Sequence, residues 1–210
     1  PSAQNPPKAI CTTFRTLPGS FLREVWTNIG GQNNVTELVR RSDRFRNTPA
    51  VVDYTEGAVS PRDWGNNYGQ RLRGYVTVPE TGTYRFYVSS DDHSQVWVSE
   101  DGTPWGKKLA VDFRDWSDIE EWTKSGRQQS REYVLEAGQK LYVEVLHKEG
   151  NNGDFVQLGW TTPGHATPEQ IPSECIRSYA LDANDQDDDG LPDDWELLHG
   201  IDPGSKSGSN

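Results

Sequence analysis

The sequence predicts an all-β protein, an antiparallel β-sandwich with long loops, followed by a short C-terminal extension. Three observations lead to this class: polar and apolar residues alternate over many short segments, clusters of Gly, Pro, Asn and Asp separate those segments, and the 210 residues include 8 Trp and 8 Tyr. Alternation with a period of two buries one face of a strand and exposes the other. A few large aromatic side chains can fill a sandwich core.

Six segments alternate most clearly. They are Arg71–Val78, Tyr84–Ser90, Gln95–Val98, Glu132–Leu135, Leu141–Leu146 and Phe155–Trp160. The turn residues between them predict reversals at Pro79–Thr83 and Glu136–Gln139. Helical patterns are few. Short helices are expected at Val35–Arg41 and Asp193–His199, and Pro163–Pro172 is expected to be an irregular exit from the sandwich.

Charge and composition divide the chain into three parts. Residues 1–18 are expected to be an N-terminal linker, residues 19–177 the sandwich domain, and residues 178–210 a separate C-terminal extension. The net charge is −11, yet eight of the acidic residues fall between Asp182 and Glu196, and residues 1–177 carry a net of only −3. The sandwich has no basic stripe, which argues against a nucleic-acid partner. No stretch approaches the ~20 apolar residues of a membrane span, so membrane insertion is not expected.

Two adjacent carboxylates, Asp91 and Asp92, come at the end of one predicted strand and just before the next. Neighbouring side chains of a strand point to opposite faces. Both can hold one cation only if the backbone bends sharply, as a cis peptide bond would make it do. The pair alone is more simply a solvated turn.

A second loop, His147–Asp154, interrupts a strand with Asn, Asp and Gly residues. Asn and Asp oxygens and exposed backbone carbonyls are the hard donors that Ca²⁺ prefers. Taken alone, this segment is an ordinary hairpin loop. Together with the Asp91–Asp92 pair it indicates a calcium site.

At this point the sequence resembles the protective-antigen-type (PA-fourteen) lectin domain, from about Gly19 to Ile176. The resemblance rests on short motifs in the same order as in the family. These begin at Arg23 (REVW), Trp64 (WGNNYGQRLRGY), Gly82 (GTYRF), Ser89 (SSDD), Gln128 (QQS), Ala137 (AGQ), His147 (HKEG) and Leu158 (LGW).

The resemblance implies a β-sandwich in which the Asp-Asp pair, joined by a cis peptide, holds one calcium ion, and sugar hydroxyls complete the ion's coordination. Carried over by position, Asp91 and Asp92 are the paired ligands, and Asn151, Asn152 and Asp154 are contributors from the second loop. His93 is expected to join these residues in contacting the sugar. Ca²⁺ takes 6–8 oxygen ligands, so a vicinal diol can replace two waters on the ion.

The acidic extension carries a second calcium pattern. Its spacing matches the EF-hand loop D-x-D-x-D-G-x₅-E, and Asp185–Pro203 is also similar to half-EF-hand and thrombospondin type-three repeats. The predicted ligands of at least one further ion are Asp185, Asp187, Asp189, Leu191 (through its carbonyl), Asp193 and Glu196. A disordered acidic linker is the alternative interpretation of the same residues.

The two cysteines, Cys11 and Cys175, lie near the two ends of the sandwich segment. Because domain termini often lie close together, a disulfide between them is predicted. Two separate buried thiols are the alternative. A disulfide would indicate an oxidising compartment, so the chain is expected to be secreted or at the cell surface. The chain starts at Pro1 and contains no Met, which is typical of a mature or excised segment.

These observations favour a calcium-dependent carbohydrate-binding module of an adhesin. Its expected partners are glycans on cell surfaces or polysaccharides, along with flanking modules of a larger chain. Two alternatives stay open: a spacer module without a ligand, and an accessory binding domain of a secreted glycoside hydrolase. An enzyme would use Asp91 with Glu149 or Asp154 as an acid–base pair, but calcium-bound carboxylates are poor proton donors because the cation stabilises their ionised form.

Overall fold

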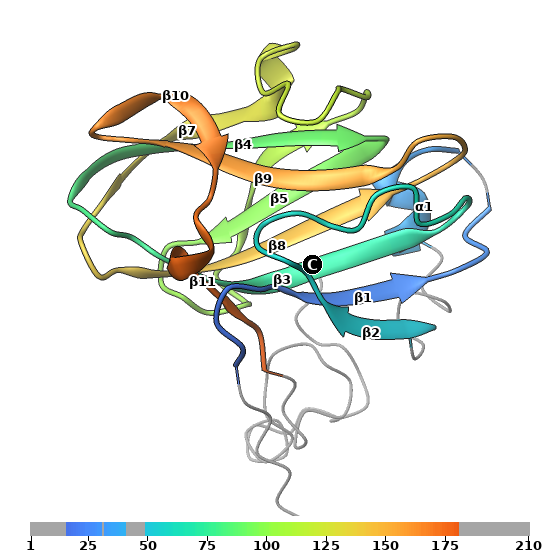
Figure 1. Ribbon diagram of the computed structural model, residues 1–210, viewed down its shortest axis with the longest axis horizontal. Coiled ribbons are helices and arrows are strands. Elements are labelled where there is room, and N and C mark those ends of the chain that lie inside the picture. The colour runs from blue at the N-terminus through green and yellow to red at the C-terminus, as the bar shows by residue number, and fades with distance from the viewer. Residues whose placement is uncertain (1–15, 31, 41–48, 181–210) are drawn as a thin grey trace, which may run out of the picture.

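A computed structural model describes residues 16–30, 32–40 and 49–180, and all the strands that it contains pair antiparallel (Figure 1). The larger sheet consists of β1 (Leu22–Trp26), β2 (Val51–Tyr54), β3 (Gly69–Thr77), β5 (His93–Ser99), β6 (Lys108–Phe113), β8 (Lys140–Lys148) and β11 (Ile176–Ser178). Its strand order is β2-β1-β3-β8-β5-β6, and β11 also pairs with β3. The smaller sheet has the order β10-β9-β4-β7, with β4 (Gly82–Asp91), β7 (Gln129–Leu135), β9 (Phe155–Thr162) and β10 (His165–Gln170). The sandwich class predicted from the sequence is confirmed.

Alternating apolar residues of the two sheets face each other and form the core. On β8, Leu141, Val143 and Val145 are buried among aromatic and aliphatic side chains of the smaller sheet, including Phe86 and Trp160. The central strands β4, β8 and β9 thus contribute every second residue to the core, as the period of two requires. Burial of such large rings is the main favourable term in the stability of this sandwich.

Short helices and several strands complete the fold. Helix α1 (Val35–Arg40) lies where a short helix was predicted, and the 3₁₀ turns are η1 (Gly126–Gln128) and η2 (Ser173–Cys175). Strands β1, β2, β6, β10 and β11 lie outside the six segments predicted from alternation. The segment expected to be an irregular exit contains β10, whose mostly exposed residues include Pro168. Pro is tolerated on an edge strand because no ladder donor is needed on the free side.

Both ends of the described chain meet at β3. The Leu17 N–H donates to Ser178 Oγ and the Ser178 N–H to the Leu17 carbonyl, at 2.7 and 2.9 Å, and Pro18 forms a bridge with Arg177. Tyr179 packs against Tyr142 of β8 in an edge-to-face contact. The structured chain therefore includes residues on both sides of the expected boundaries at 18 and 177.

Candidate functional site

Asp91 ends β4 and Asp92 precedes β5. The pair therefore lies where the chain passes from the smaller sheet to the larger one. The peptide bond between them is cis. Ser90 fixes the turn, because its hydroxyl donates to the Asp92 carbonyl at 2.8 Å, and its backbone exchanges hydrogen bonds with the backbone N–H and hydroxyl of Ser117. The position of the two carboxylates is thus set by the protein itself.

His147 of β8 supports the same turn from beneath. The Gln70 amide donates to His147 Nδ1 at 2.9 Å, so Nε2 carries the proton and donates to the Asp91 carbonyl at 2.8 Å. Burial lowers the pKa of His147 to about 4. The ring is therefore neutral near pH 7, and its role is to hold the backbone of Asp91 in place.

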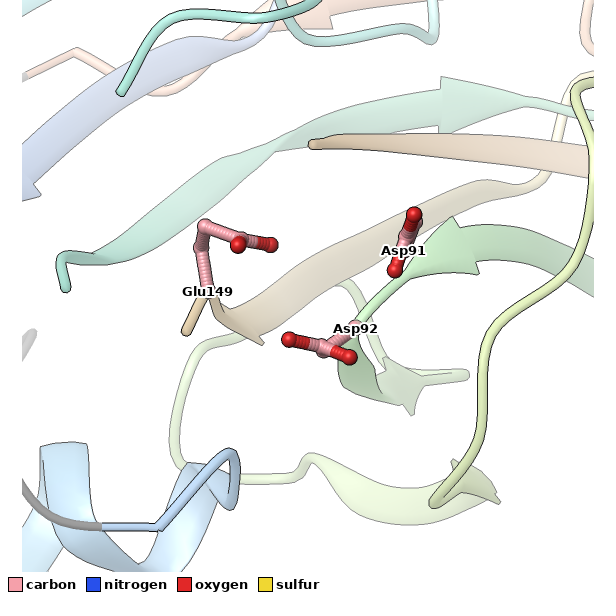
Figure 2. A group of neighbouring side chains, drawn as sticks. All are labelled: Asp91, Asp92 and Glu149. Atoms are coloured by element: carbon pink, nitrogen blue, oxygen red, sulfur yellow. The ribbon is translucent and has the colours of Figure 1, made fainter. Parts of the chain in front are cut away.

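A third carboxylate, that of Glu149, meets the pair from the loop after β8. Ligand oxygens of Asp91, Asp92 and Glu149 all lie within 4.8 Å of one another, and this is the one such group of metal-binding side chains in the part of the chain that the structure describes. Figure 2 shows the three carboxylates around a common space. The Gly150 N–H donates to Asp92 Oδ2 at 3.1 Å and so ties the two loops together.

The carboxylate of Glu149 is buried without compensation. Its exposed fraction is 0%, and neither oxygen has a hydrogen-bond partner among the described residues. Burial raises the pKa of Glu149 to about 8, with further contributions from the charges of Asp92, Asp154 and Asp91. Buried acceptors that lack a partner are rare in native proteins and need an explanation.

The pKa values of the aspartates follow the same pattern. Burial raises the pKa of Asp91 to about 6, helped by the charges of Asp92 and Asp154, and burial is also the main cause of the raised pKa of Asp92. Like charges at this separation repel unless a positive charge lies between them. A divalent cation that prefers oxygen ligands fits this donor set, because it would satisfy the two buried oxygens of Glu149 and neutralise the cluster.

The residues predicted from the second loop lie at different depths. Asn151 and Asn152 are exposed at its tip, where Asn152 has a left-handed backbone (φ 84°) and its N–H donates to Asn66 Oδ1. Asp154 is only 1% exposed, and its two oxygens accept hydrogen bonds at 2.9 Å from the Gly65 N–H and the Tyr68 hydroxyl. These contacts give Asp154 a role in holding the 61–67 loop, which lies beside the second loop.

His93 lies away from the surface on which a sugar contact was expected. Its side chain is 2% exposed, Nδ1 accepts from the Val35 N–H at 3.1 Å, and Nε2 donates to Asp112 Oδ1 at 2.8 Å. Burial lowers the pKa of His93, against the opposing effect of Asp112. With both nitrogens engaged, His93 joins α1 and β6 to the start of β5 and so positions the Asp91–Asp92 turn.

Glu149 is the one member of this carboxylate group that the sequence did not predict as part of a cation site; it was considered only as a member of a catalytic acid–base pair. The available signal was its place directly after β8, beside a Gly-rich loop. Several predicted residues lie outside the described residues. These are Cys11, the partner proposed for Cys175, and the C-terminal calcium ligands Asp185, Asp187, Asp189, Leu191, Asp193 and Glu196.

A separate hollow of about 650 Å³ is lined by residues that include Tyr54, Glu56 and Gln170, far along the sheets from the carboxylates. It does not coincide with the metal-binding group found among the described residues. No helix in the described ranges has the length and apolar character that a membrane crossing requires.

Comparison with known proteins places this geometry in a family context. The family model of the PA14 domain matches residues 23–174. Among curated proteins, a mouse (Mus musculus) protein, N-acetyl-beta-glucosaminyl-glycoprotein 4-beta-N-acetylgalactosaminyltransferase 1, is 37% identical over 121 residues. The match covers 55% of this chain but only 11% of that enzyme, so the chain corresponds to a small part of its relative's length.

Two solved structures share the fold. The PA14 sugar-binding domain from an RTX adhesin aligns with a TM-score of 0.56 and 13% identity, over 78% of this chain and 100% of that one. The Epithelial Adhesin 6 A domain from Candida glabrata, solved with Galβ1-3GlcNAc, aligns with a TM-score of 0.54 and 14% identity, over 85% and 93%. At these identities the comparison establishes the fold.

Proposed function

The chain belongs to the PA14 domain family, and from this premise we propose that it is a calcium-dependent carbohydrate-binding domain rather than an enzyme. The observation that carries the proposal is Glu149, a buried carboxylate that has no hydrogen-bond partner among residues 16–30, 32–40 and 49–180 and shares one small space with Asp91 and Asp92. Hard oxygen donors in this number suit Ca²⁺, which takes 6–8 of them. The two adhesin structures, one a sugar-binding domain and one in complex with a disaccharide, support a carbohydrate ligand.

Asp91, Asp92 and Glu149 would hold the ion, and Asn151 and Asn152 stand at the exposed tip of the neighbouring loop, where side-chain or carbonyl oxygens can add to the set. Asp154 contributes negative charge and holds the adjacent loop. When bound, calcium supplies coordination positions that sugar hydroxyls can fill in place of water.

The residues of the chain do the positioning. Ser90, His147 and Gly150 fix the backbone and side chains of the aspartate pair through hydrogen bonds that need no ligand. Such pre-organisation lowers the entropy lost on binding. A shallow site of this kind binds one sugar weakly, and a Kd near 1 mM corresponds to about −4 kcal/mol. Firm attachment would then require several sites acting together.

Catalysis by the same carboxylates is disfavoured by burial. A general acid must come within hydrogen-bond reach of the glycosidic oxygen, but both oxygens of Glu149 are inaccessible, and Asp154 is 1% exposed with both oxygens engaged. Hydrolysis of nitrophenyl glycosides by the purified protein would contradict this assignment.

We extend the proposal to the surroundings of the domain. Glycans on cell surfaces or polysaccharides are the proposed partners, and a secreted or cell-surface adhesin is the proposed context. The predicted Cys11–Cys175 disulfide agrees with that context and stays a prediction. The calcium loop from Asp185 to Glu196 is proposed as a second, independent ion site in a connector to a flanking module.

The decisive experiment is a glycan array probed in millimolar calcium and again with chelator. We expect binding that chelator abolishes, and that Asp91→Asn and Asp92→Asn each remove. A matched control is Glu136→Gln, which removes one exposed charge from the turn before β8. That turn lies at the opposite end of β8 from the site, roughly 25 Å away. Calcium-independent binding, or full binding by the Asp91 variant, would refute the assignment. A protein that binds neither calcium nor any glycan would be a spacer module.

A further inference from the structure

The 61–67 loop, distant in sequence from the aspartate pair, forms the third wall of the candidate site. Its backbone is joined to the second loop at several points: the Asp63 N–H donates to the Asp154 carbonyl at 3.0 Å, and the Asn67 N–H to the Gly150 carbonyl at 2.8 Å. The Gly65 N–H bonds to the Asp154 side chain. The two loops therefore hold each other in place.

Asp63 projects from this loop toward the cluster. It is exposed and has a left-handed backbone (φ 51°), which Asp tolerates better than most residues. A Cβ atom placed on Gly153 would lie 3.3 Å from Asp91 Oδ2 and 3.9 Å from Asp63 Oδ1. The absence of a side chain at position 153 thus leaves one small space that both carboxylates face.

The carboxylate of Asp63 has no hydrogen bond or ion pair within the described ranges, whereas its backbone N–H is engaged. Asp63 also lies outside the group of Asp91, Asp92 and Glu149, whose ligand atoms all lie within 4.8 Å of one another. An exposed acceptor next to a cation site, but beyond the ion's own ligands, is placed to meet whatever the ion binds. An ionised carboxylate accepts hydrogen bonds and cannot donate them.

We propose that Asp63 is a specificity-determining residue that accepts a hydrogen bond from a hydroxyl of the bound sugar and restricts the site to uncharged sugars. The inference rests on the proposed function, and the buried, unpartnered carboxylate of Glu149 is the independent sign that this cluster takes a ligand. A uronic or sialic acid would bring its carboxylate next to that of Asp63, where no described cation pairs with it.

Other charges around the site agree with this selection. Asp115, which is exposed, lies close enough to Asp92 to contribute to the raised pKa of that residue, and Lys124 acts in the opposite direction on Asp91. A single divalent ion would leave the three carboxylates of the cluster with one net negative charge. Asp63, Asp115 and Asp154 add three more, and Lys124 and Lys148, whose charges act on Asp91 and Asp92, offset two of them. The mouth of the site therefore stays negative with calcium bound.

The test measures calcium binding and sugar binding separately. Calorimetry with calcium alone should give Asp63→Asn and Asp63→Ala the same affinity as the unmodified protein, within about twofold. Sugar binding is then measured in calcium with methyl galactoside, glucoside and mannoside, each paired with its 6-carboxylate counterpart. For whichever sugar binds, the unmodified protein should prefer the neutral member by roughly tenfold or more, an effect in the range of one charged hydrogen bond.

Asp63→Ala should weaken binding of the neutral sugar by roughly tenfold, because acceptor and charge are both lost. Asp63→Asn keeps an acceptor and should lose only a few-fold, while its preference for the neutral member shrinks to about threefold or less. Glu136→Gln serves as the control and should change neither value. Unchanged affinity and selectivity in both Asp63 variants would overturn this inference alone.

Two other results would also overturn it: a loss of calcium affinity of tenfold or more in Asp63→Asn, which would make Asp63 an ion ligand, or a preference of the unmodified protein for the acidic sugars. Failure of the unmodified protein to bind any of these sugars in calcium would remove the proposed function, and the inference with it. The calcium titration and the control variant distinguish that failure from the others.

Discussion

At the scale of single residues, the cluster is a set of charges that the fold alone does not balance. Glu149 is held beside Asp91 and Asp92 with both oxygens buried and unpartnered. Burying an ionised group without a partner is costly, so the native state contains a local penalty that a bound cation would remove. Stability and ligand binding should therefore be coupled at this one position.

Glu149→Gln tests the coupling through a reversal of sign. In chelator above pH 8, where Glu149 with its pKa of about 8 is ionised, the variant should be more stable than the unmodified protein, because it removes a buried negative charge from beside two others. In calcium the order should reverse, since the unmodified protein gains about 2.7 kcal/mol when free calcium is 100 times Kd. Thermal unfolding in both conditions measures the difference. The same order in chelator and in calcium would argue against Glu149 as a ligand.

Glu144 of β8 is a buried carboxylate with the opposite environment. Burial by itself would raise its pKa, but Lys107, whose ammonium lies 3.0 Å from both oxygens, and Arg71 outweigh that effect and lower the pKa to about 2. A depressed folded-state pKa gives stability that is present above the unfolded value near 4.5 and is lost as the pH falls toward 2.

The free energy of unfolding should accordingly lose up to about 3 kcal/mol from this group between pH 4.5 and 2. Urea unfolding of the unmodified protein and of Glu144→Gln, compared at each pH in chelator, isolates the contribution. The advantage of the unmodified protein should narrow over that interval. A constant difference in unfolding free energy between the two proteins down to pH 2 would show that Glu144 is not the source of the pH-dependent loss of stability.

At the scale of elements, β1 and β3 are joined by a buried ion network as well as by their ladder. Glu24 is paired with Arg71 across the strands and accepts two hydrogen bonds from each of Arg71 and Arg73, at 2.8 to 3.1 Å. Arg73 also lies 4.3 Å from the centre of the Tyr179 ring. The network thus connects β1, β3 and the segment after β11.

Glu24→Gln should destabilise the domain by about 3–5 kcal/mol, because it removes the charge that two buried guanidinium groups share. Glu132→Gln is the control: Glu132 pairs with Arg85 at an exposed position, and an exposed pair contributes roughly 0–1 kcal/mol. Chemical denaturation measures both changes. Equal losses in the two variants would mean that the buried network adds nothing specific.

The elements also show what the sequence could and could not predict. Strands β3, β4, β8 and β9 are long, and the alternation of polar and apolar residues makes them recognisable in the sequence. Strands β2, β10 and β11 are short or lie at edges, so their burial pattern is set by neighbours that the sequence does not identify. The Asp91–Asp92 pair could be proposed from the sequence because the two residues are adjacent. Glu149 and Asp63 could not, since their proposed roles depend on how loops far apart in sequence come together.

At the scale of the whole molecule, the two ends of the described chain meet beside the middle of β3, while the carboxylate site lies at one end of that strand. Gly69 pairs with Lys148 beside the site, whereas Ser178 pairs with Gly74 and the Tyr179 N–H donates to the Arg73 carbonyl. About 13 Å of strand therefore separates the site from the last described residues. Because the ligands of the predicted calcium loop fall within twelve consecutive residues, we expect that loop to act independently of sugar binding.

Truncation after Ala180, which keeps β11 and Tyr179, tests this independence. Calorimetry should count one calcium fewer than in the full chain, because the ligands from Asp185 to Glu196 are removed, while sugar affinity stays the same. An unchanged calcium count would refute the predicted EF-hand-like loop. Lost sugar binding would show that the extension takes part in the site.

The pairing of Leu17 with Ser178 has a mechanical consequence. Tension applied through the two flanking segments meets the sandwich at one short stretch of chain, where Leu17 and Pro18 bond to Ser178 and Arg177. These contacts would carry the force and separate first. The loops around Asp91 take no part in these contacts between Leu17, Pro18, Arg177 and Ser178. If the domain is a surface module as proposed, a force on the flanking segments would act first on this pairing and leave the proposed ligand site undeformed.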